Sequence, residues 1–232
     1  MKSDFKIIAF DADDTLWINE TFFRETEEKF CSLLSDFSTS EETMKELFAT
    51  EMKNLADYGY GTKSFVLSMI ETALSITGNR VSQSTLEEII DLGKTQINQP
   101  VELLNGVIET LEYLQDKGYK LIVATKGDLL DQERKLRKSG LEKYFHHVEV
   151  MSNKNKPDYQ KLIKHLDIQP KDFLMIGNSY KSDIEPVIEL GSYAIHIPFH
   201  ITWEHEKATE NEEHPNWIKI QKLTDVKTFL PG

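Results

Sequence analysis

The sequence predicts an α/β fold, a doubly wound parallel sheet interrupted by an inserted bundle of helices. After Pro100, short apolar runs alternate with amphipathic segments, and repeated strand and helix units of this kind form parallel sheets with helices on both faces. Between the first apolar run and Pro100 the spacing of apolar residues is helical throughout. The expected domains are a core of residues 1–17 and 99–232 and an inserted helical domain of residues 18–98.

The first predicted strand covers residues 7–10 and is followed at once by Asp11, Asp13 and Asp14. A continuous apolar run suits a strand that is buried on both faces. Carboxylates crowded at the end of such a strand are desolvated and repel one another, so a cation is needed to keep them ionised. Magnesium prefers oxygen ligands of this kind, and open parallel sheets bind ligands beyond the carboxyl ends of their strands. The alternative is an acidic helix cap, because Asp and Thr are common capping residues.

Four amphipathic helices are predicted in residues 18–98. Their apolar positions are Phe22, Phe23, Phe30, Leu33, Leu34 and Phe37, then Met44, Leu47, Phe48, Met52 and Leu55, then Phe65, Val66, Met69, Ile70, Ala73 and Leu74, then Leu86, Ile89, Ile90 and Leu92. Ser40 and either Ser82 or Ser84 mark helix starts. A glycine-containing loop at residues 58–63 carries Tyr60, which either contacts a substrate or sits half buried in a connection between helices.

Strands and helices alternate after Pro100. The predicted helices cover residues 107–117, 128–139, 157–166 and 184–190, and the predicted strands cover residues 120–125, 147–151, 173–176 and 193–197. Residues 199–216 are acidic and contain three histidines whose spacing matches no compact metal-ligand pattern. We expect this acidic segment to be a solvated loop.

Asp11-Ala12-Asp13-Asp14-Thr15 after a hydrophobic strand resembles the first motif of the haloacid dehalogenase superfamily, Asp-x-Asp-x-Thr. This resemblance implies a Rossmann-like core with a helical cap inserted after the first motif. It also implies that Asp11 is a covalent nucleophile and Asp13 a general acid and base. Dehalogenases of this superfamily carry Tyr two residues after the nucleophile, whereas Asp13 matches the phosphatase and mutase form.

Two later stretches resemble further motifs of the family. Thr125-Lys126-Gly127 ends a predicted strand, as the second motif does, and there the Thr hydroxyl binds a phosphoryl oxygen. Lys126 stands where members often carry Asn, and it either adds positive charge or points to solvent. Lys154-Asn155-Lys156-Pro157 resembles the third motif, a Lys commonly followed by Pro, so Pro157 favours Lys156 over Lys154.

Residues 176–183 resemble the fourth motif, Gly-Asp-x-x-x-x-Asp. Gly177 allows close approach of the backbone, and Asp183 is implied as a carboxylate of the metal shell. Asn178 stands where the family often has a metal-binding Asp, and its amide oxygen can bind magnesium but brings no charge. The implied metal ligands are Asp11, Asp13, Asn178 and Asp183.

The resemblance implies a Mg²⁺-dependent hydrolase of small phosphate esters that forms a phospho-aspartyl intermediate. It assigns catalysis to Asp11, Asp13, Thr125 and Lys156, and substrate binding to Thr125, Lys126, Gly127, Lys156 and Tyr60. The alternatives are a phosphomutase with the same site, a metal-independent hydrolase of the dehalogenase type, a catalytically lapsed phosphate-binding protein and a signalling receiver. The length of the chain and its helical insert disfavour the receiver.

The charge and the apolar content of the chain limit the classes of molecule that it is expected to bind. A net charge of −12 over 232 residues argues against non-specific binding to nucleic acid or to an anionic membrane surface, because both need clustered Lys and Arg. No apolar run reaches the roughly 18 residues of a membrane span, and residues 1–5 do not resemble a signal peptide, so a cytoplasmic location is expected. The expected partner is a small-molecule phosphate ester, and the oligomeric state is open.

Overall fold

The structure is a computed structural model that describes residues 4–211 and 214–230. The chain divides into two compact units. The sheet unit takes its residues from Met1–Glu20, Val101–Lys126 and Gln132–Gly232, and the helical unit from Thr21–Pro100 and Gly127–Asp131. Residues 127–131, which the sequence-based division assigned to the core, thus group with the helices.

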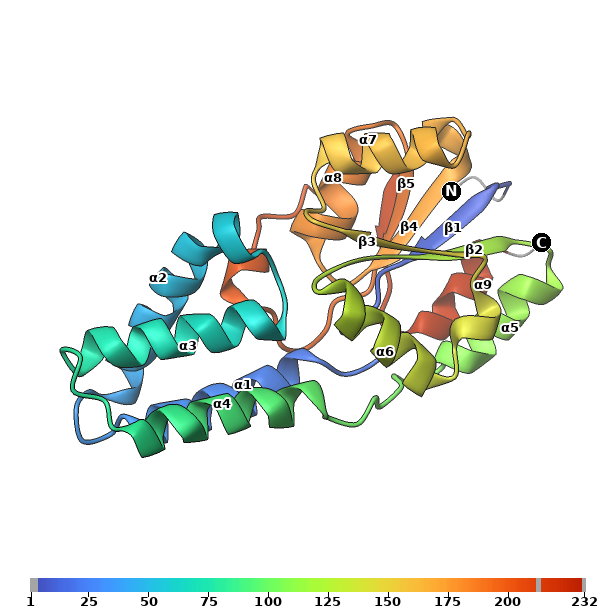
Figure 1. The fold of residues 1–232 in the computed structure, drawn as a ribbon. Helices are drawn as coiled ribbons and strands as arrows, with labels where there is room; N and C mark the ends of the chain where they lie inside the picture. The colour runs from blue at the N-terminus through green and yellow to red at the C-terminus, as the bar shows by residue number, and fades with distance from the viewer. Residues whose placement is uncertain (1–3, 212–213, 231–232) are drawn as a thin grey trace. The chain divides into compact units, whose positions relative to one another are not determined.

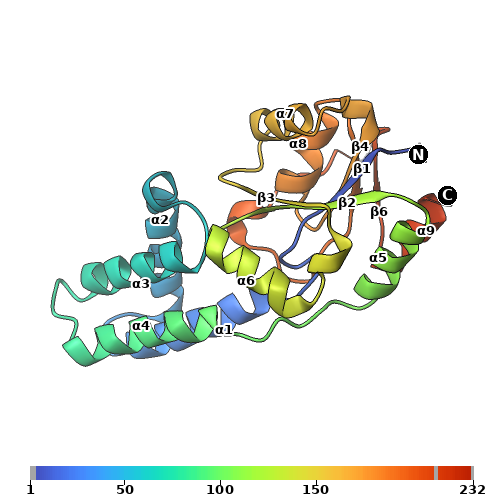
Figure 2. The same ribbon diagram turned by 45° about the vertical axis from the view of Figure 1, so that its right-hand side comes forward.

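Six parallel strands form one sheet in the described residues, in the order β3-β2-β1-β4-β5-β6 (Figures 1 and 2). They are β1 (Ile7–Phe10), β2 (Lys120–Lys126), β3 (His147–Met151), β4 (Phe173–Gly177), β5 (Tyr193–His196) and β6 (Trp217–Lys219). Strand β1 is central, and Phe10 pairs with Val123 of β2 and with Ile176 of β4. The residues after β1 therefore emerge between the ends of β2 and β4. The predicted parallel α/β sheet is confirmed.

Helices cover both faces of the sheet (Figure 1). One face carries α5 (Val107–Asp116), α6 (Leu129–Ser139) and α9 (Val226–Phe229), and the other carries α7 (Lys156–His165) and α8 (Glu185–Ile188). Side chains of a strand alternate between the faces, and accordingly Ile8 and Phe10 belong to the first core while Ile7 and Ala9 belong to the second. Burial on both faces explains why residues 7–10 form an unbroken apolar run.

The helical unit contains the four predicted helices. They are α1 (Glu20–Leu33), α2 (Ser40–Tyr58), α3 (Thr62–Ile76) and α4 (Gln83–Ile97). Their apolar stripes meet in a separate core that includes Phe30, Leu47, Phe65, Met69 and Ile89. Polar side chains cap the starts of α2 and α4. Ser82 caps α4, whereas α2 is capped by Thr39 in a capping box with Glu42, one residue before the predicted position.

Two elements differ from the sequence-based expectation. The sequence pattern did not predict β6, which pairs with β5 through Ala194 and Trp217. The helix predicted at residues 184–190 is present only as the short α8 (Glu185–Ile188), and a π-turn, Tyr180–Ile184, which the sequence pattern did not predict, precedes it. Residues 1–3, and Glu212 and Glu213 of the acidic segment, lie outside the described residues. No helix in the described part of the chain is both long and apolar enough to cross a membrane.

Candidate active site

Asp11 follows β1 directly and continues the sheet register, because its backbone N–H donates to the Ile176 carbonyl at 2.9 Å. Its side chain is buried. Asp11 Oδ1 accepts a hydrogen bond from Lys154 Nζ, and the same ammonium donates to Asp183 Oδ1 at 2.6 Å. One buried cation thus joins two buried carboxylates that are 172 positions apart in the chain. The site is assembled entirely from the sheet unit.

Burial sets the protonation of this cluster. Loss of solvent raises the pKa of Asp11 to about 7, and Asp183 and Asp13 add to the rise while Lys154 opposes it. Burial alone would lower the pKa of Lys154, but the two carboxylates raise it, so the lysine stays charged. Asp11 therefore needs additional positive charge nearby to be fully ionised at neutral pH.

The lysine at the site is Lys154, not Lys156. The Lys154 side chain is 1% exposed, whereas that of Lys156 is 48% exposed and pairs with Glu189 at 3.6 Å. Lys156 begins α7 and is followed by Pro157 at an early helical position, which marks the helix start and not the catalytic side chain. Asn155 caps this helix by accepting from the Asp158 N–H, so Lys154 precedes the cap. The preference for Lys156 based on Pro157 is corrected accordingly.

Oxygen atoms converge beside Asp11. The Asn178 side-chain amide lies 3.2 Å from Asp11 Oδ2 and 3.2 Å from the Asp13 carbonyl oxygen. With its nitrogen toward them, the amide donates hydrogen bonds. With its oxygen toward them, three hard oxygens face one another, which is the donor chemistry that suits Mg²⁺ with additional waters. No cluster of three or more His, Cys, Asp or Glu side chains suited to a metal occurs in residues 4–211 and 214–230. The oxygen set therefore fits magnesium through one carboxylate, one amide and one carbonyl.

The Asp13 carboxylate turns away from this oxygen set. It accepts hydrogen bonds from Trp17 Nε1 at 2.7 Å, from Gln132 Nε2 at 2.8 Å and from Lys135 Nζ at 2.9 Å. Asp13 thus faces Asn178 with its backbone carbonyl and not with its side chain. Gln132 and Lys135 carry no motif, and their spacing of three on α6 is the only signal that they share a face.

Asp14 is the residue for which the helix-cap alternative holds. Its Oδ1 accepts from the backbone N–H groups of Asn19 at 2.8 Å and Glu20 at 3.1 Å, where α1 begins. Its φ of 59° lies in the left-handed region, which Asp tolerates better than most residues. Burial raises the pKa of Asp14 to about 7. The three acids that follow β1 therefore have three different environments.

Asp183 is connected to Asp11 through the Lys154 ammonium. Its Oδ2 accepts from the Ser179 N–H at 3.0 Å while its Oδ1 contacts Lys154. A Cβ atom on Gly177 would lie 2.3 Å from Asp183 Cγ, so only glycine allows the carboxylate to pack here. The structure places Asp183 one contact away from Asp11, with Lys154 between them.

The remaining predicted residues separate into two groups. Thr125 is buried at the end of β2, and Lys126 Nζ donates to Ser182 Oγ at 2.9 Å. Gly127 and Tyr60 belong to the helical unit. There Lys63 Nζ donates to Asp128 Oδ2 at 2.9 Å, so the loop that carries Tyr60 contacts the residues that follow Lys126 in the chain.

Glu206 is a largely buried carboxylate from the acidic segment, which was predicted to be solvated. Burial alone would raise its pKa, but the Lys126 ammonium and hydrogen bonds from Ser179 and Ser182 lower the pKa from 4.5 to about 2. Nothing in the local sequence distinguishes it from the neighbouring Glu204 and Glu210, because the segment has no helix or strand periodicity. The expectation of a solvated loop is therefore wrong for Glu206.

This carboxylate should make the stability of the protein fall in acid. Since the pKa of Glu206 is about 2 when folded and 4.5 ordinarily, the unfolded chain binds more protons below pH 4.5. Between pH 5 and pH 3, the free energy of unfolding of the wild type should fall more steeply than that of Glu206→Gln, by at most about 1.4 kcal/mol per pH unit. Urea denaturation at several pH values measures both slopes. The exposed Glu204→Gln should follow the wild type, and equal slopes for wild type and Glu206→Gln would contradict the expectation.

Comparison with known proteins identifies relatives of this chain. The family model for haloacid dehalogenase-like hydrolases matches residues 5–191. The glyceraldehyde 3-phosphate phosphatase of Methanothermobacter thermautotrophicus is 24% identical over 95% of this chain and 96% of its own length. The pyrophosphatase PpaX of Bacillus thuringiensis is 28% identical, but the match covers 50% of this chain and 57% of that protein.

Solved structures share the fold. A haloacid dehalogenase-like family hydrolase from Xanthomonas campestris superposes with a TM-score of 0.88 at 32% identity, covering 98% of this chain and 91% of that one. The L-2-haloacid dehalogenase of Xanthobacter autotrophicus, with covalently bound chloropropionic acid, has a TM-score of 0.68 at 13% identity, covering 98% and 99%. The family model spans most of the sequence, and the Xanthomonas relative covers nearly all of it. This chain belongs to the haloacid dehalogenase-like hydrolases.

Proposed function

We propose that this hydrolase is a Mg²⁺-dependent phosphatase that hydrolyses small phosphate monoesters through a phospho-aspartyl intermediate on Asp11. The observation that carries the proposal is the position of Asp11 at the end of β1. One of its oxygens contacts Lys154, and the other lies 3.2 Å from the Asn178 amide, which also lies 3.2 Å from the Asp13 carbonyl oxygen. Catalysis of phosphoryl transfer consists mainly of positioning and charge compensation, which this arrangement supplies.

In the first step the Asp11 carboxylate attacks phosphorus and the ester oxygen leaves with a proton from Asp13. Asp13 then takes a proton from the water that hydrolyses the acyl phosphate. Hydrogen bonds from Trp17, Gln132 and Lys135 fix the orientation of the Asp13 side chain. Thr125 at the end of β2 is our candidate for a hydrogen bond to the phosphoryl group.

Magnesium would be held by Asp11 Oδ2, the Asn178 amide oxygen and the Asp13 carbonyl, and when bound it would supply positive charge for the phosphoryl oxygens. Such charge would also lower the pKa of Asp11, which burial raises to about 7. Lys154 offsets the charge of both Asp11 and Asp183. Since Asn178 adds no charge to the site, we expect weaker magnesium binding than a second carboxylate would give.

The substrate class follows from the relative that aligns over almost its full length, which is named a glyceraldehyde 3-phosphate phosphatase. We therefore assign a small phosphorylated metabolite. We assign the helical unit as the cap of this hydrolase, with Tyr60 as a candidate substrate contact.

Chelation tests the proposal. Turnover of p-nitrophenyl phosphate should fall by at least about tenfold in EDTA and return when excess MgCl₂ is added, because Asp11 and the phosphoryl oxygens lose their shared cation. Released inorganic phosphate and nitrophenol are both measured, and a panel of sugar and triose phosphates identifies the preferred ester. Turnover that is indifferent to EDTA would favour the metal-independent dehalogenase type. Transfer of phosphate to a second hydroxyl instead of water would identify a phosphomutase.

A further inference from the structure

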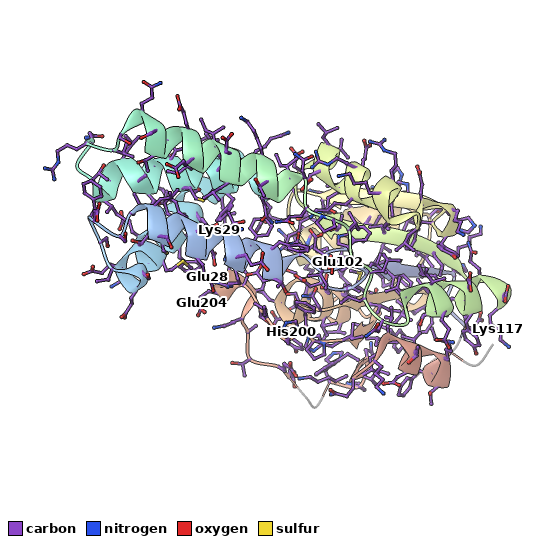
Figure 3. All side chains as sticks on the ribbon, turned by 90° about the horizontal axis from the view of Figure 1, so that it is seen from below. Glu28, Lys29, Glu102, Lys117, His200 and Glu204 are labelled. Carbon is purple, nitrogen blue, oxygen red and sulfur yellow. The ribbon has the colours of Figure 1, made fainter. Side chains whose placement is uncertain are left out.

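The acidic segment brings a carboxylate to the carboxyl edge of the sheet. Glu206 ends a short helical turn, Glu204–Glu206, and its side chain is 11% exposed. Glu204 on the same turn is labelled in Figure 3, and its side chain is 60% exposed and pairs with Lys207. Two glutamates of one turn therefore have opposite environments, and burial of the second needs a structural reason.

The contacts of Glu206 supply that reason. Its Oε2 accepts hydrogen bonds from Ser179 Oγ and from Ser182 Oγ, both at 2.5 Å. Its Oε1 pairs with Lys126 Nζ, which also donates to Ser182 Oγ at 2.9 Å. Lys126 is the last residue of β2, and the two serines belong to the turn after β4. One carboxylate thus connects the ends of two strands.

These two strands are the neighbours of β1 on either side. Glu206 therefore links the segments that flank Asp11, and its effect continues through the π-turn. Ser179 Oγ accepts from the Ser182 N–H at 3.1 Å, and the Ser179 N–H donates to Asp183 Oδ2 at 3.0 Å. Asp183 in turn contacts Lys154. A chain of direct hydrogen bonds runs from Glu206 to the cation beside the nucleophile.

We propose that Glu206 is a positioning residue that fixes the end of β2 relative to the turn bearing Asn178 and Asp183, and so sets the geometry in which phosphate and Mg²⁺ bind. This inference rests on the proposed phosphatase function. It also reassigns Lys126, because its ammonium is neutralised by Glu206 and acts as a structural partner instead of a phosphate ligand. Removal of a residue that orients the ligands of a metal site typically lowers metal affinity or activity by about 10- to 100-fold.

Glu206→Gln tests the inference, with Glu204→Gln as the matched control on the same turn. The amide keeps the size and one acceptor oxygen of the side chain but leaves the Lys126 ammonium without its counter-charge. We expect kcat/KM for p-nitrophenyl phosphate to fall about 10- to 100-fold and the Mg²⁺ concentration at half-maximal turnover to rise about tenfold. Glu206→Asp keeps the charge and should recover part of the loss. Glu204→Gln should stay within about twofold of the wild type, since its ion pair is exposed.

Calorimetric titration with MgCl₂, and then with inorganic phosphate, measures positioning without turnover. The affinity of Glu206→Gln for both should be about tenfold lower than that of the wild type. A lower melting temperature with unchanged kcat/KM and unchanged Mg²⁺ affinity would show that Glu206 only stabilises the fold, and would overturn the inference.

If Glu206→Gln does not fold, Ser179→Ala, which removes one hydroxyl contact, should show the same pattern to a smaller degree. Wild-type protein that binds both ligands but releases no phosphate would contradict the proposed function alone, and calorimetry would then decide the role of Glu206.

Discussion

Asp11→Asn should reduce phosphate release from p-nitrophenyl phosphate by at least about 1,000-fold. An amide is a poor nucleophile and cannot form the acyl phosphate, so substitution removes the covalent route and not merely a contact. The change is isosteric at a residue that is 7% exposed, and the packing around β1 should be retained. Steady-state assays with Mg²⁺ in excess, together with trapping of radiolabelled phosphate on the wild-type protein at low pH, measure both the loss and the intermediate.

Asp14→Asn is the control for Asp11→Asn. Asp14 lies three residues further along, is also buried, and also has its pKa raised to about 7 by burial. Its oxygen accepts from the backbone at the start of α1, a contact that the Asn carbonyl oxygen can replace. We therefore expect turnover within about fivefold of the wild type, because Asn is an equally good helix cap. An Asp11→Asn protein that retained a tenth or more of wild-type turnover would refute Asp11 as the nucleophile.

The sequence predicted most helices and strands of the fold but not one edge strand and one turn. Apolar runs predicted β1, β2, β4 and β5, because burial on both faces favours such runs, whereas β3 at the edge of the sheet was predicted from the mixed sequence His147-Val148-Glu149-Val150-Met151. Strand β6 is different. It has three residues, lies at the edge of the sheet, and follows a polar segment, so no periodicity marks it. The π-turn at Tyr180–Ile184 was also missed, since its hydrogen bonds depend on the positions of Ser179 and Asp183 in space.

Motif position locates a backbone segment at the site, but it does not determine which side chain points inward. Asp13 was expected at the metal site with no atom specified, and the structure places its carbonyl beside Asn178 while the carboxylate contacts α6. Glu206 lies in a segment whose composition indicates solvent exposure, and only the tertiary fold brings it to Lys126 and the two serines. Contacts between residues distant in sequence therefore account for most of what sequence reasoning missed.

Lys154→Met should be the most destabilising single substitution at the site. Lys154 Nζ lies between Asp11 and Asp183, and the side chains of Lys154 and Asp183 are each 1% exposed. Removing one partner of a buried ion pair leaves an uncompensated charge and costs about 3–5 kcal/mol of unfolding free energy. In a chain of this length that corresponds to a fall in melting temperature of about 6–20 °C. Thermal denaturation in EDTA, where no added cation can replace the ammonium, measures the effect.

The same substitution should also abolish most activity, and Lys156→Met separates the two lysines. Without the Lys154 ammonium, the pKa of Asp11 should rise further above 7, so the nucleophile would be largely protonated at neutral pH. We expect turnover to fall at least about 100-fold for Lys154→Met, with partial recovery at higher pH as Asp11 ionises.

Lys156 is about half exposed and 3.6 Å from Glu189, and loss of such a surface pair changes stability by less than about 1 kcal/mol. A Lys156→Met protein that lost activity while Lys154→Met kept it would show that the contacts of Lys154 do not support catalysis.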